Sequence, residues 1–275
     1  MPELPEVESV RRFLEGRICG FSITGVEVRE GRLRHHVDSA ALCSVVGCRI
    51  ASLDRRGKYL LMGLDDGRVV VIHLGMSGHV RLCGPGVPIE RHDHVLFTLG
   101  SEWQLRYNDP RRFGTVQVLE KAEAEAKSAF ANLGPEPLSD AFTAAHLRAR
   151  AQGRSIAVKS FLMDGRIVAG VGNIYANEAL FRAGINPLRA AGSLSAEEWR
   201  HLRRAVREVL RAAIKRGGTT LRDEGFRNPG GERGYFQVRL HVYGREGLPC
   251  RRCGGTIVRV RLGGRSTYFC AGCQS

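Results

Sequence analysis

Residues 250–273 read CRRCGGTIVRVRLGGRSTYFCAGC, and this stretch decides the fold of the C-terminal end of the chain. It contains two Cys-x-x-Cys pairs, Cys250 with Cys253 and Cys270 with Cys273, separated by sixteen residues. This spacing lets two tight turns close a tetrahedron of thiolates around one zinc ion. Because all four ligands are cysteines, no coordination position is left for a catalytic water. The zinc ion is therefore predicted to be structural.

The residues between the two pairs predict a β-hairpin. Residues 256–262 and 266–269 have strand-like patterns, and Gly263-Gly264 supplies the turn. Residues 245–275 include six arginines and one glutamate, a charge that suits contact with phosphates. A disulfide framework is the alternative to zinc, but a cytosolic context disfavours it. Zinc ribbons also occur in unrelated proteins, so the motif establishes a metal and little more.

The overall composition indicates a folded protein with an anionic partner. The 275 residues are 43% hydrophobic and 25% charged, and this length suggests two domains. Lys and Arg number 42 against 28 Asp and Glu, which gives a formal net charge of +14. Such an excess favours nucleic acid, because phosphates release counterions when a basic protein binds. A basic protein that uses its charge for solubility is the alternative.

No segment predicts a membrane span or a signal peptide. The longest apolar run, residues 69–74, has the length of a strand. Glu3, Glu6 and Glu8 stand where a signal peptide needs basic and apolar residues. We therefore expect a cytoplasmic protein with no membrane partner.

Hydrophobic periodicity changes along the chain before the cysteines. Residues 2–14 have helical spacing, and residues 21–119 contain many short β-rich runs that indicate a β-sandwich or barrel. NLGPEPLSD, residues 132–140, marks a domain boundary through its prolines and glycine. The expected fold class is therefore α+β with several domains. Four helices are expected beyond the boundary, over residues 141–151, 155–163, 174–183 and 196–216.

A glycine-rich turn, residues 164–173, separates the second and third of these helices. Glycine lets a phosphate approach the backbone, and free amides at a helix start favour an anion. A plain turn between helices is equally compatible with the composition.

Five further segments, together with the cysteine pairs, resemble one family. They are MPELPEVE at residues 1–8, RRGKYLL at 55–61, HLGMSG at 73–78, DPRRFG at 109–114 and GVGNIYANE at 170–178. In this order and combination, the chain closely resembles the bacterial formamidopyrimidine-DNA glycosylases from Pro2 to the last cysteine.

The resemblance implies a fold of three parts and a DNA repair activity. Residues 1–133 would form a catalytic domain with an N-terminal helix and a β-sandwich. Residues 134–237 would form a helix-two-turn-helix DNA-binding domain with a lesion-capping loop, and residues 238–275 a zinc finger. Damaged duplex DNA would bind a monomer between the domains. The implied reaction is excision of 8-oxoguanine and formamidopyrimidines, followed by strand cleavage through β,δ-elimination.

The motif matches also imply roles for residues near the reacting sugar. Pro2 would be the amine nucleophile once the initiator methionine is removed, with Glu3 as its acid–base partner and Glu6 as a positioning carboxylate. Lys58 would contact the phosphate beside the lesion and assist the chemistry, and Arg265 would bind the DNA backbone at the same place. Taken singly, a proline and a carboxylate at a helix start are common structural features. The match to PELPEVE favours catalysis.

An enzyme that acts on a base in duplex DNA has to flip that base out. The resemblance implies that Met76, Arg111 and Phe113 fill the resulting void. Read singly, Met and Phe are more often core residues, but the arginines beside Phe113 favour a protruding loop. The remaining implied contacts are to phosphates: His92, Arg112, Lys159 and Asn173.

Other functions remain open on the sequence. The endonuclease VIII branch acts on oxidised pyrimidines, but ELPEV at residues 3–7 and the void-filling set argue against it. A non-catalytic DNA-damage-binding protein is favoured if retained methionine blocks Pro2. A zinc-ribbon nucleic-acid adaptor predicts that the first fifteen residues are dispensable. Residues 219–236 correspond to the lesion-capping loop, but their centre, NPGG at 228–231, departs from the family pattern, so this segment does not specify a base preference.

Overall fold

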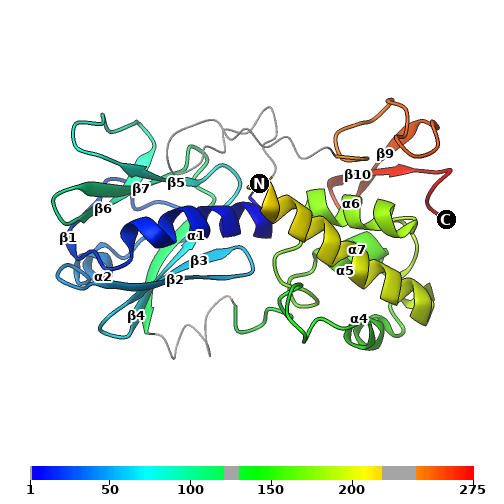
Figure 1. The fold of residues 1–275 in the computed structure, drawn as a ribbon, viewed down its shortest axis with the longest axis horizontal. Coiled ribbons are helices and arrows are strands. Elements are labelled where there is room, and N and C mark those ends of the chain that lie inside the picture. Colours follow the sequence, from blue (N-terminus) through cyan, green and yellow to red (C-terminus); the bar gives the residue numbers. More distant parts are fainter. Residues whose placement is uncertain (1, 121–129, 219–239) are drawn as a thin grey trace. The chain divides into compact units, whose positions relative to one another are not determined.

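The computed structural model describes residues 2–120, 130–218 and 240–275, and the chain divides into two compact units (Figure 1). Unit 1 comprises residues 1–131 and 217–236, and Unit 2 comprises residues 132–216 and 237–275. The finer division into three parts, with boundaries after residues 133 and 237, stays a prediction.

Unit 1 contains two four-stranded antiparallel sheets, as expected for a β-sandwich. The strand order is β1-β6-β7-β5 in one sheet and β2-β3-β4-β8 in the other. Apolar side chains from both sheets share one core, because alternate residues of each strand point to the same face. The strands are β1 (Ile23–Val28), β2 (Ile50–Arg56), β3 (Tyr59–Leu64), β4 (Arg68–His73), β5 (His79–Cys83), β6 (Asp93–Leu99), β7 (Trp103–Asn108) and β8 (Thr115–Glu120). A short helix, α2 (Ser39–Cys43), follows β1.

Helix α1 (Leu4–Ile18) packs against β2 and β3 and adds an apolar stripe to this core. The stripe consists of Val7, Val10, Leu14 and Ile18, each at most 1% exposed and spaced as one helical face. The predicted helix over residues 2–14 is therefore confirmed in kind, but it extends one turn further.

The start of α1 also differs from the prediction. Glu3 is the N-cap residue, and its backbone N–H donates to Oε2 of Glu6 at 2.8 Å. Pro5 occupies the first turn, where a missing N–H costs nothing. Pro2 thus precedes the helix by two residues instead of beginning it, because the cap is formed by Glu3.

Unit 2 consists of helices followed by the C-terminal hairpin. The helices are α4 (Ala144–Ala151), α5 (Val158–Met163), α6 (Asn173–Ala183) and α7 (Ala196–Lys215), with a short 3₁₀ turn η1 (Ala191–Ser193). The hairpin is β9 (Ile257–Leu262) and β10 (Arg265–Cys270). Helix α4 begins three residues later than predicted, because the Thr143 side chain accepts the N–H of His146 at 3.0 Å and caps it. Helix α5 likewise begins at Val158 instead of residue 155.

Among the described residues, no helix has both the length and the apolar character needed to cross a bilayer.

Candidate functional site

The four cysteines of the two C-terminal pairs lie together in Unit 2. Their sulfur atoms are all within 4.8 Å of one another. Cys253 Sγ and Cys270 Sγ are 3.4 Å apart, and Cys250 Sγ and Cys273 Sγ are 3.9 Å apart. A tetrahedron with Zn–S bonds of about 2.3 Å has S–S edges of about 3.8 Å, so the geometry fits one zinc ion. The predicted zinc site is confirmed, and its all-thiolate ligand set leaves no position for a reactive water.

Polar side chains of α5 and α6 fix the zinc hairpin to the helices. Lys159 is 1% exposed, and its Nζ donates to the Ser266 carbonyl at 3.0 Å and to Thr267 Oγ1 at 2.7 Å. Asn173 Nδ2 donates to the same Ser266 carbonyl at 3.1 Å. The exposed Arg265 is adjacent to Ser266 in β10, so the structure brings Lys159, Asn173 and Arg265 together. We assign Lys159 to docking the hairpin, because its ammonium group has partners inside Unit 2, and its phosphate contact stays a prediction.

Glu178 on α6 holds the segment that leads into the zinc site. Its carboxylate is 5% exposed and accepts the backbone N–H groups of His241, Val242 and Tyr243, each at 2.9 Å. Several N–H donors on one buried carboxylate make a strong, charge-assisted anchor. No separate signal in the sequence indicated this role, although Glu178 closes the GVGNIYANE segment.

Loss of the zinc ion is expected to release the hairpin while Unit 1 stays folded. Cys253→Ser should lower the zinc content from about one ion per chain to near zero and abolish amide protection in β9 and β10, because the thiolates are the main link between the two turns. Metal analysis and hydrogen exchange measure both effects. Cys43→Ser, at an exposed cysteine in Unit 1, is the matched control. A Cys253→Ser protein that still binds one zinc ion tightly would contradict the assignment.

Two other predicted catalytic residues, Pro2 and Glu3, lie in Unit 1 at the start of α1. Pro2 is buried, and Glu3 and Glu6 are 1% and 2% exposed. The hydrogen bond from the Glu3 N–H to Glu6 fixes the backbone directly after Pro2. Glu6 therefore has the positioning contact that its predicted role requires.

Glu8, one turn further along α1, is the centre of a buried ion cluster. Burial by itself raises the pKa of its carboxyl group, but hydrogen bonds from Arg11, Arg12 and Arg55 outweigh this and lower the pKa to about 2. The side chains of Glu8 and Arg55 are each 11% exposed, so the bond between them is largely shielded from solvent, whereas the Arg12 side chain is 58% exposed.

One of these arginines links α1 to the turn that carries Lys58. Arg55 Nε donates to Glu8 at 3.1 Å, and Arg55 Nη1 donates to the Gly57 carbonyl at 2.9 Å. Gly57 and Lys58 form the turn between β2 and β3, where Gly57 has a φ of 57°. The half-buried Lys58 is thereby held near the first turns of α1. The role of Arg55 has no local signal in the sequence, because only the fold brings this side chain to Glu8.

The Glu8 cluster predicts a pH dependence of stability. Because the pKa of Glu8 is lower in the folded state, its contribution is present above pH 4.5 and is lost as the pH falls toward about 2. Glu8→Gln should reduce the free energy of unfolding at pH 7 by roughly 2–3 kcal/mol and flatten its decline over that range. Urea unfolding at a series of pH values measures this. Glu15→Gln, at a carboxylate that is 52% exposed, should cost at most about 0.5 kcal/mol. If the free energy of unfolding declined equally steeply with falling pH in the two variants, the prediction would be refuted.

Met76, Arg111 and Phe113 come from two loops that a single buried carboxylate joins. Asp109 is 0% exposed. Its carboxylate accepts Ser77 Oγ at 2.7 Å, the Gly114 N–H at 2.9 Å and the Tyr107 hydroxyl at 3.1 Å. It also accepts the Arg111 N–H at 3.3 Å. Ser77 belongs to the loop between β4 and β5, whereas the other donors flank the loop between β7 and β8, so Asp109 fixes one loop against the other.

The two loops also touch through their backbones. Gly75 has a φ of 64°, and a Cβ atom there would lie 2.5 Å from the Gly114 nitrogen and the Phe113 carbonyl carbon. Only glycine allows this approach. The Gly75 N–H in turn donates to Nδ1 of His73 at 3.1 Å. Burial, and then the charges of Lys58 and Arg34, lower the pKa of His73 to about 4, so the ring is neutral at pH 7 and can accept this bond.

The predicted void-filling side chains are therefore close together and accessible. Met76 is half-buried, Arg111 is exposed and Phe113 is 44% exposed. The Arg111 guanidinium carbon lies 4.8 Å from the centre of the Phe113 ring, a cation–π contact. A core position for Phe113 is excluded, as the DPRRFG context predicted.

The two predicted phosphate-binding residues of Unit 1 adjoin the same loops. The carbonyl of the half-buried His92 accepts the Asp109 N–H at 3.1 Å. Arg112 has a φ of 57° and makes an ion pair with Glu30 at 3.3 Å. Among the described residues, Arg112 is the one non-glycine residue with positive φ, and such strain often marks a functional loop. Residues 219–236, predicted to cap the lesion, lie outside the described residues.

Replacing Asp109 is expected to loosen both loops at once. Asp109→Asn keeps the size but turns an NH₂ group toward at least one donor, so the free energy of unfolding should fall by about 2–3 kcal/mol. Ser77→Ala removes one bond and should cost about 1 kcal/mol. Denaturant unfolding measures stability, and hydrogen exchange at residues 74–78 and 111–114 measures loop order. Unchanged exchange in the Asp109→Asn variant would show that the carboxylate does not join the loops.

Three family models match the chain in sequence order. The formamidopyrimidine-DNA glycosylase N-terminal domain matches residues 1–116, and the H2TH domain of the same family matches residues 133–224. A zinc finger found in FPG and IleRS matches residues 247–275.

Whole-chain relatives agree with these matches. The chain is 54% identical to the formamidopyrimidine-DNA glycosylase of Methylococcus capsulatus over 100% of both chains. The crystal structure of the MutM (Fpg) protein of Thermus thermophilus superimposes with a TM-score of 0.89 at 43% identity, covering 99% of this chain and 98% of that one. Lactococcus lactis Fpg in complex with DNA that contains an abasic site gives a TM-score of 0.92 at 35% identity over 100% of both chains. A mutant of that protein has also been solved with DNA that contains Fapy-dG.

Proposed function

The chain belongs to the formamidopyrimidine-DNA glycosylase family, and from this we propose that it is a base excision repair enzyme that removes oxidised purines from duplex DNA. We further propose that it cleaves the strand at the resulting abasic site. The observation that carries the proposal is the start of α1, where Pro2 directly precedes a buried carboxylate, Glu3. The substrates named for the relatives, formamidopyrimidines and abasic sites, support the same chemistry.

The reaction begins with Pro2 as the nucleophile. Once the initiator methionine is removed, its nitrogen is a secondary amine that attacks C1′ of the damaged nucleotide. The bond from C1′ to the base breaks, and the base leaves with the bonding electrons and takes up a proton. Opening of the sugar ring, with a proton from Glu3 to the ring oxygen, converts the adduct into an iminium ion.

The secondary amine makes strand cleavage possible. Its iminium has no N–H to lose, so it stays cationic and acts as an electron sink for loss of a C2′ proton. The 3′ phosphate then leaves by β-elimination, and the 5′ phosphate by δ-elimination. Proximity to the partial positive charge at the N-terminus of α1 disfavours the ammonium form of Pro2, which increases the share of reactive amine.

We propose that the substrate is recognised by the two loops joined by Asp109 and by the Unit 2 hairpin. We propose that Met76, Arg111 and Phe113 fill the void left by the flipped base. Their accessible positions and the rigid loop junction support this role. Phosphate contacts are proposed for a set of basic and polar residues: Lys58, His92, Arg112, Lys159, Asn173 and Arg265.

The partner is damaged duplex DNA, and we propose that the enzyme acts as a monomer. We propose a cytoplasmic location, because chromosomal DNA lies there in bacteria. The one zinc ion keeps the hairpin folded and takes no part in the reaction.

A covalent trap tests the nucleophile and the substrate class together. The enzyme is incubated with borohydride and a duplex that contains 8-oxoguanine opposite cytosine, and with a matched duplex that contains an oxidised pyrimidine. Borohydride reduces the iminium, so a stable protein–DNA adduct is expected with the first duplex in preference to the second. Pro2→Gly, which replaces the secondary amine, should lower adduct yield at least tenfold, while Glu15→Gln, at an exposed carboxylate of the same helix, should retain the adduct.

The alternative functions give distinct outcomes. Preferred trapping on the oxidised pyrimidine would assign the chain to that substrate class. Tight lesion binding with no adduct would leave a damage-binding protein and overturn the catalytic proposal.

A further inference from the structure

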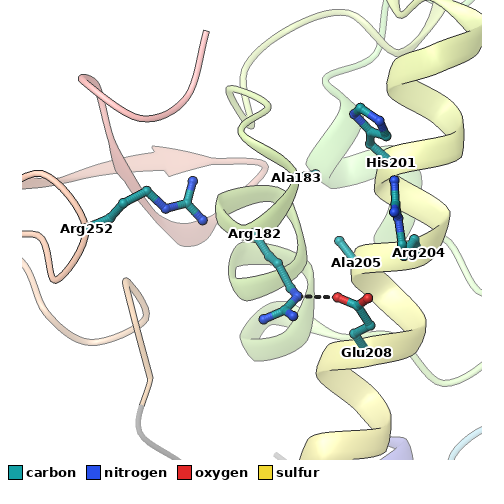
Figure 2. A pocket seen from close by; sticks show the side chains of 7 residues that line it. All are labelled: Arg182, Ala183, His201, Arg204, Ala205, Glu208 and Arg252. Atoms are coloured by element: carbon teal, nitrogen blue, oxygen red, sulfur yellow. Dashed lines mark hydrogen bonds and ion pairs between the residues drawn. The ribbon is translucent and has the colours of Figure 1, made fainter.

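Seven arginines of Unit 2 line two adjoining hollows beside α7. The first hollow is bordered by Arg182 on α6, His201, Arg204 and Glu208 on α7, and Arg252 of the zinc-binding segment (Figure 2). The second shares Arg204 and Glu208. It adds four arginines of α7: Arg200, Arg203, Arg207 and Arg211. We call these seven arginines the arginine ridge.

The ridge is poorly neutralised by the protein itself. Glu208 is the one carboxylate among the residues that line the two hollows, and it is paired with Arg182. Seven arginines against one glutamate leave six positive charges. Arg203 Nε donates to the Phe142 carbonyl at 2.6 Å, and Arg207 Nη1 donates to the Ser139 carbonyl at 2.7 Å. These bonds fix the two side chains in place, but the neutral carbonyls supply no counter-charge, and Asp140 is the carboxylate whose charge acts on Arg207.

Repulsion within the ridge indicates that its charge serves a ligand. The five arginines of α7 lie three or four residues apart, where like charges are neighbours and destabilise a helix. Burial, and then the charges of Arg203 and Arg211, lower the pKa of Arg207. A polyanion on this surface would remove the repulsion.

The spacing of the ridge suits a nucleic-acid strand. Arg200 and Arg211 are eleven residues apart, which corresponds to about 16 Å along a helix. Five arginines over that length match the phosphates of one DNA strand, which follow one another about every 3.4 Å along the duplex axis. Arginine also pairs with phosphate through two parallel hydrogen bonds.

The buried face of α7 argues against a membrane as the partner. Its large apolar residues point into Unit 2: Trp199, Leu202, Val206 and Leu210 are each at most 1% exposed. An interfacial helix has to bury such a face in lipid, whereas the other large apolar residues of α7, Val209 and Ile214, are themselves half-buried.

We propose that the arginine ridge is a second DNA-backbone site, which binds undamaged duplex DNA in addition to the predicted contacts around Asn173. Asn173 and Arg182 stand near opposite ends of α6, about 13 Å apart along the helix axis. The ridge therefore lies away from the junction of Asn173 with Ser266. A second duplex held there would let the protein keep hold of DNA while it moves between neighbouring segments.

Salt dependence of binding to undamaged duplex DNA tests the proposal without requiring catalysis. The test variant is Arg204→Gln with Arg211→Gln, two exposed side chains of the ridge. Its control is Arg17→Gln with Arg49→Gln, two exposed arginines of Unit 1 that remove the same charge. Loss of two phosphate contacts should reduce the slope of log K against log salt by about 1.8. Between about 50 and 200 mM salt, the wild type should lose about tenfold more affinity than the ridge variant.

A second measurement asks whether two duplexes bind at once. The wild type is saturated with an unlabelled lesion duplex, and a labelled undamaged duplex is added while its fluorescence anisotropy is followed. Binding of the labelled duplex to the wild type and to the control, but at least fivefold weaker binding to the ridge variant, is the expected result. Thermal unfolding without DNA should show the ridge variant to be as stable as the wild type.

Several outcomes would overturn the proposal. Equal slopes of log K against log salt for the ridge variant and its control would show that the salt dependence reflects net charge alone and not the ridge. Absence of a second bound duplex on the wild type would exclude the site. Ridge-dependent binding to anionic vesicles or to an acidic peptide, with DNA binding unchanged, would assign the ridge to another class of partner. Failure of the borohydride trap leaves this test unaffected, because undamaged DNA is not a substrate.

Discussion

The buried carboxylate of Asp109 is the interaction on which the candidate site of Unit 1 most depends. A carboxylate without solvent contact is costly unless donors surround it, and here four donors from two loops do so. The carboxylate and its hydrogen-bond donors depend on each other. The donors stabilise the charge, and the charge fixes the loops that present Met76, Arg111 and Phe113.

The same principle, a polar group satisfied across two elements, recurs throughout the chain. Glu8 and Arg55 hold the start of α1 beside the turn of Lys58. In Unit 2, Lys159 and Glu178 fix the segments on either side of the zinc ligands. The predicted recognition residues Arg111 and Phe113 therefore lie on a short loop, and the buried carboxylate of Asp109 holds that loop in place. This arrangement keeps a site organised while leaving its surface accessible to a large substrate.

Electrostatics separates two kinds of cationic surface. Lys58, Arg112 and Arg265 lie on three separate segments of the chain, and we propose that each contacts one phosphate. The arginine ridge instead concentrates like charges along α7, with one carboxylate among the residues that line it. A row of arginines cannot position a single anionic group well, but it suits a polymer whose phosphates are regularly spaced. We therefore propose that the positive charge of the chain serves both single phosphate contacts and the retention of DNA.

The sequence by itself determined the features that depend on local spacing. Two Cys-x-x-Cys pairs specify a zinc hairpin, because both the ligand geometry and the turn lie within a few residues. Apolar spacing specified α1, α6 and α7, and alternation specified the strands of Unit 1. The likeness of MPELPEVE and DPRRFG to one family supplied the candidate residues. Helix starts were less well predicted, since capping by Glu3 and Thr143 depends on side-chain hydrogen bonds that periodicity does not report.

Only the tertiary structure decided which distant residues meet. Asp109 could be recognised in the sequence as part of the DPRRFG motif. Its hydrogen bond with Ser77 spans 32 residues, however, and requires two strands to bring the loops together. Lys159 matched a DNA-contact position, yet the fold turns its ammonium group toward β10, 107 residues away. The arginines of α7 could be counted in the sequence. Whether they faced solvent depended on which side of α7 packed into Unit 2, and the burial of Trp199 and Leu202 settled that. Sequence patterns report neighbours along the chain, whereas burial and long-range hydrogen bonds arise only when the chain has folded.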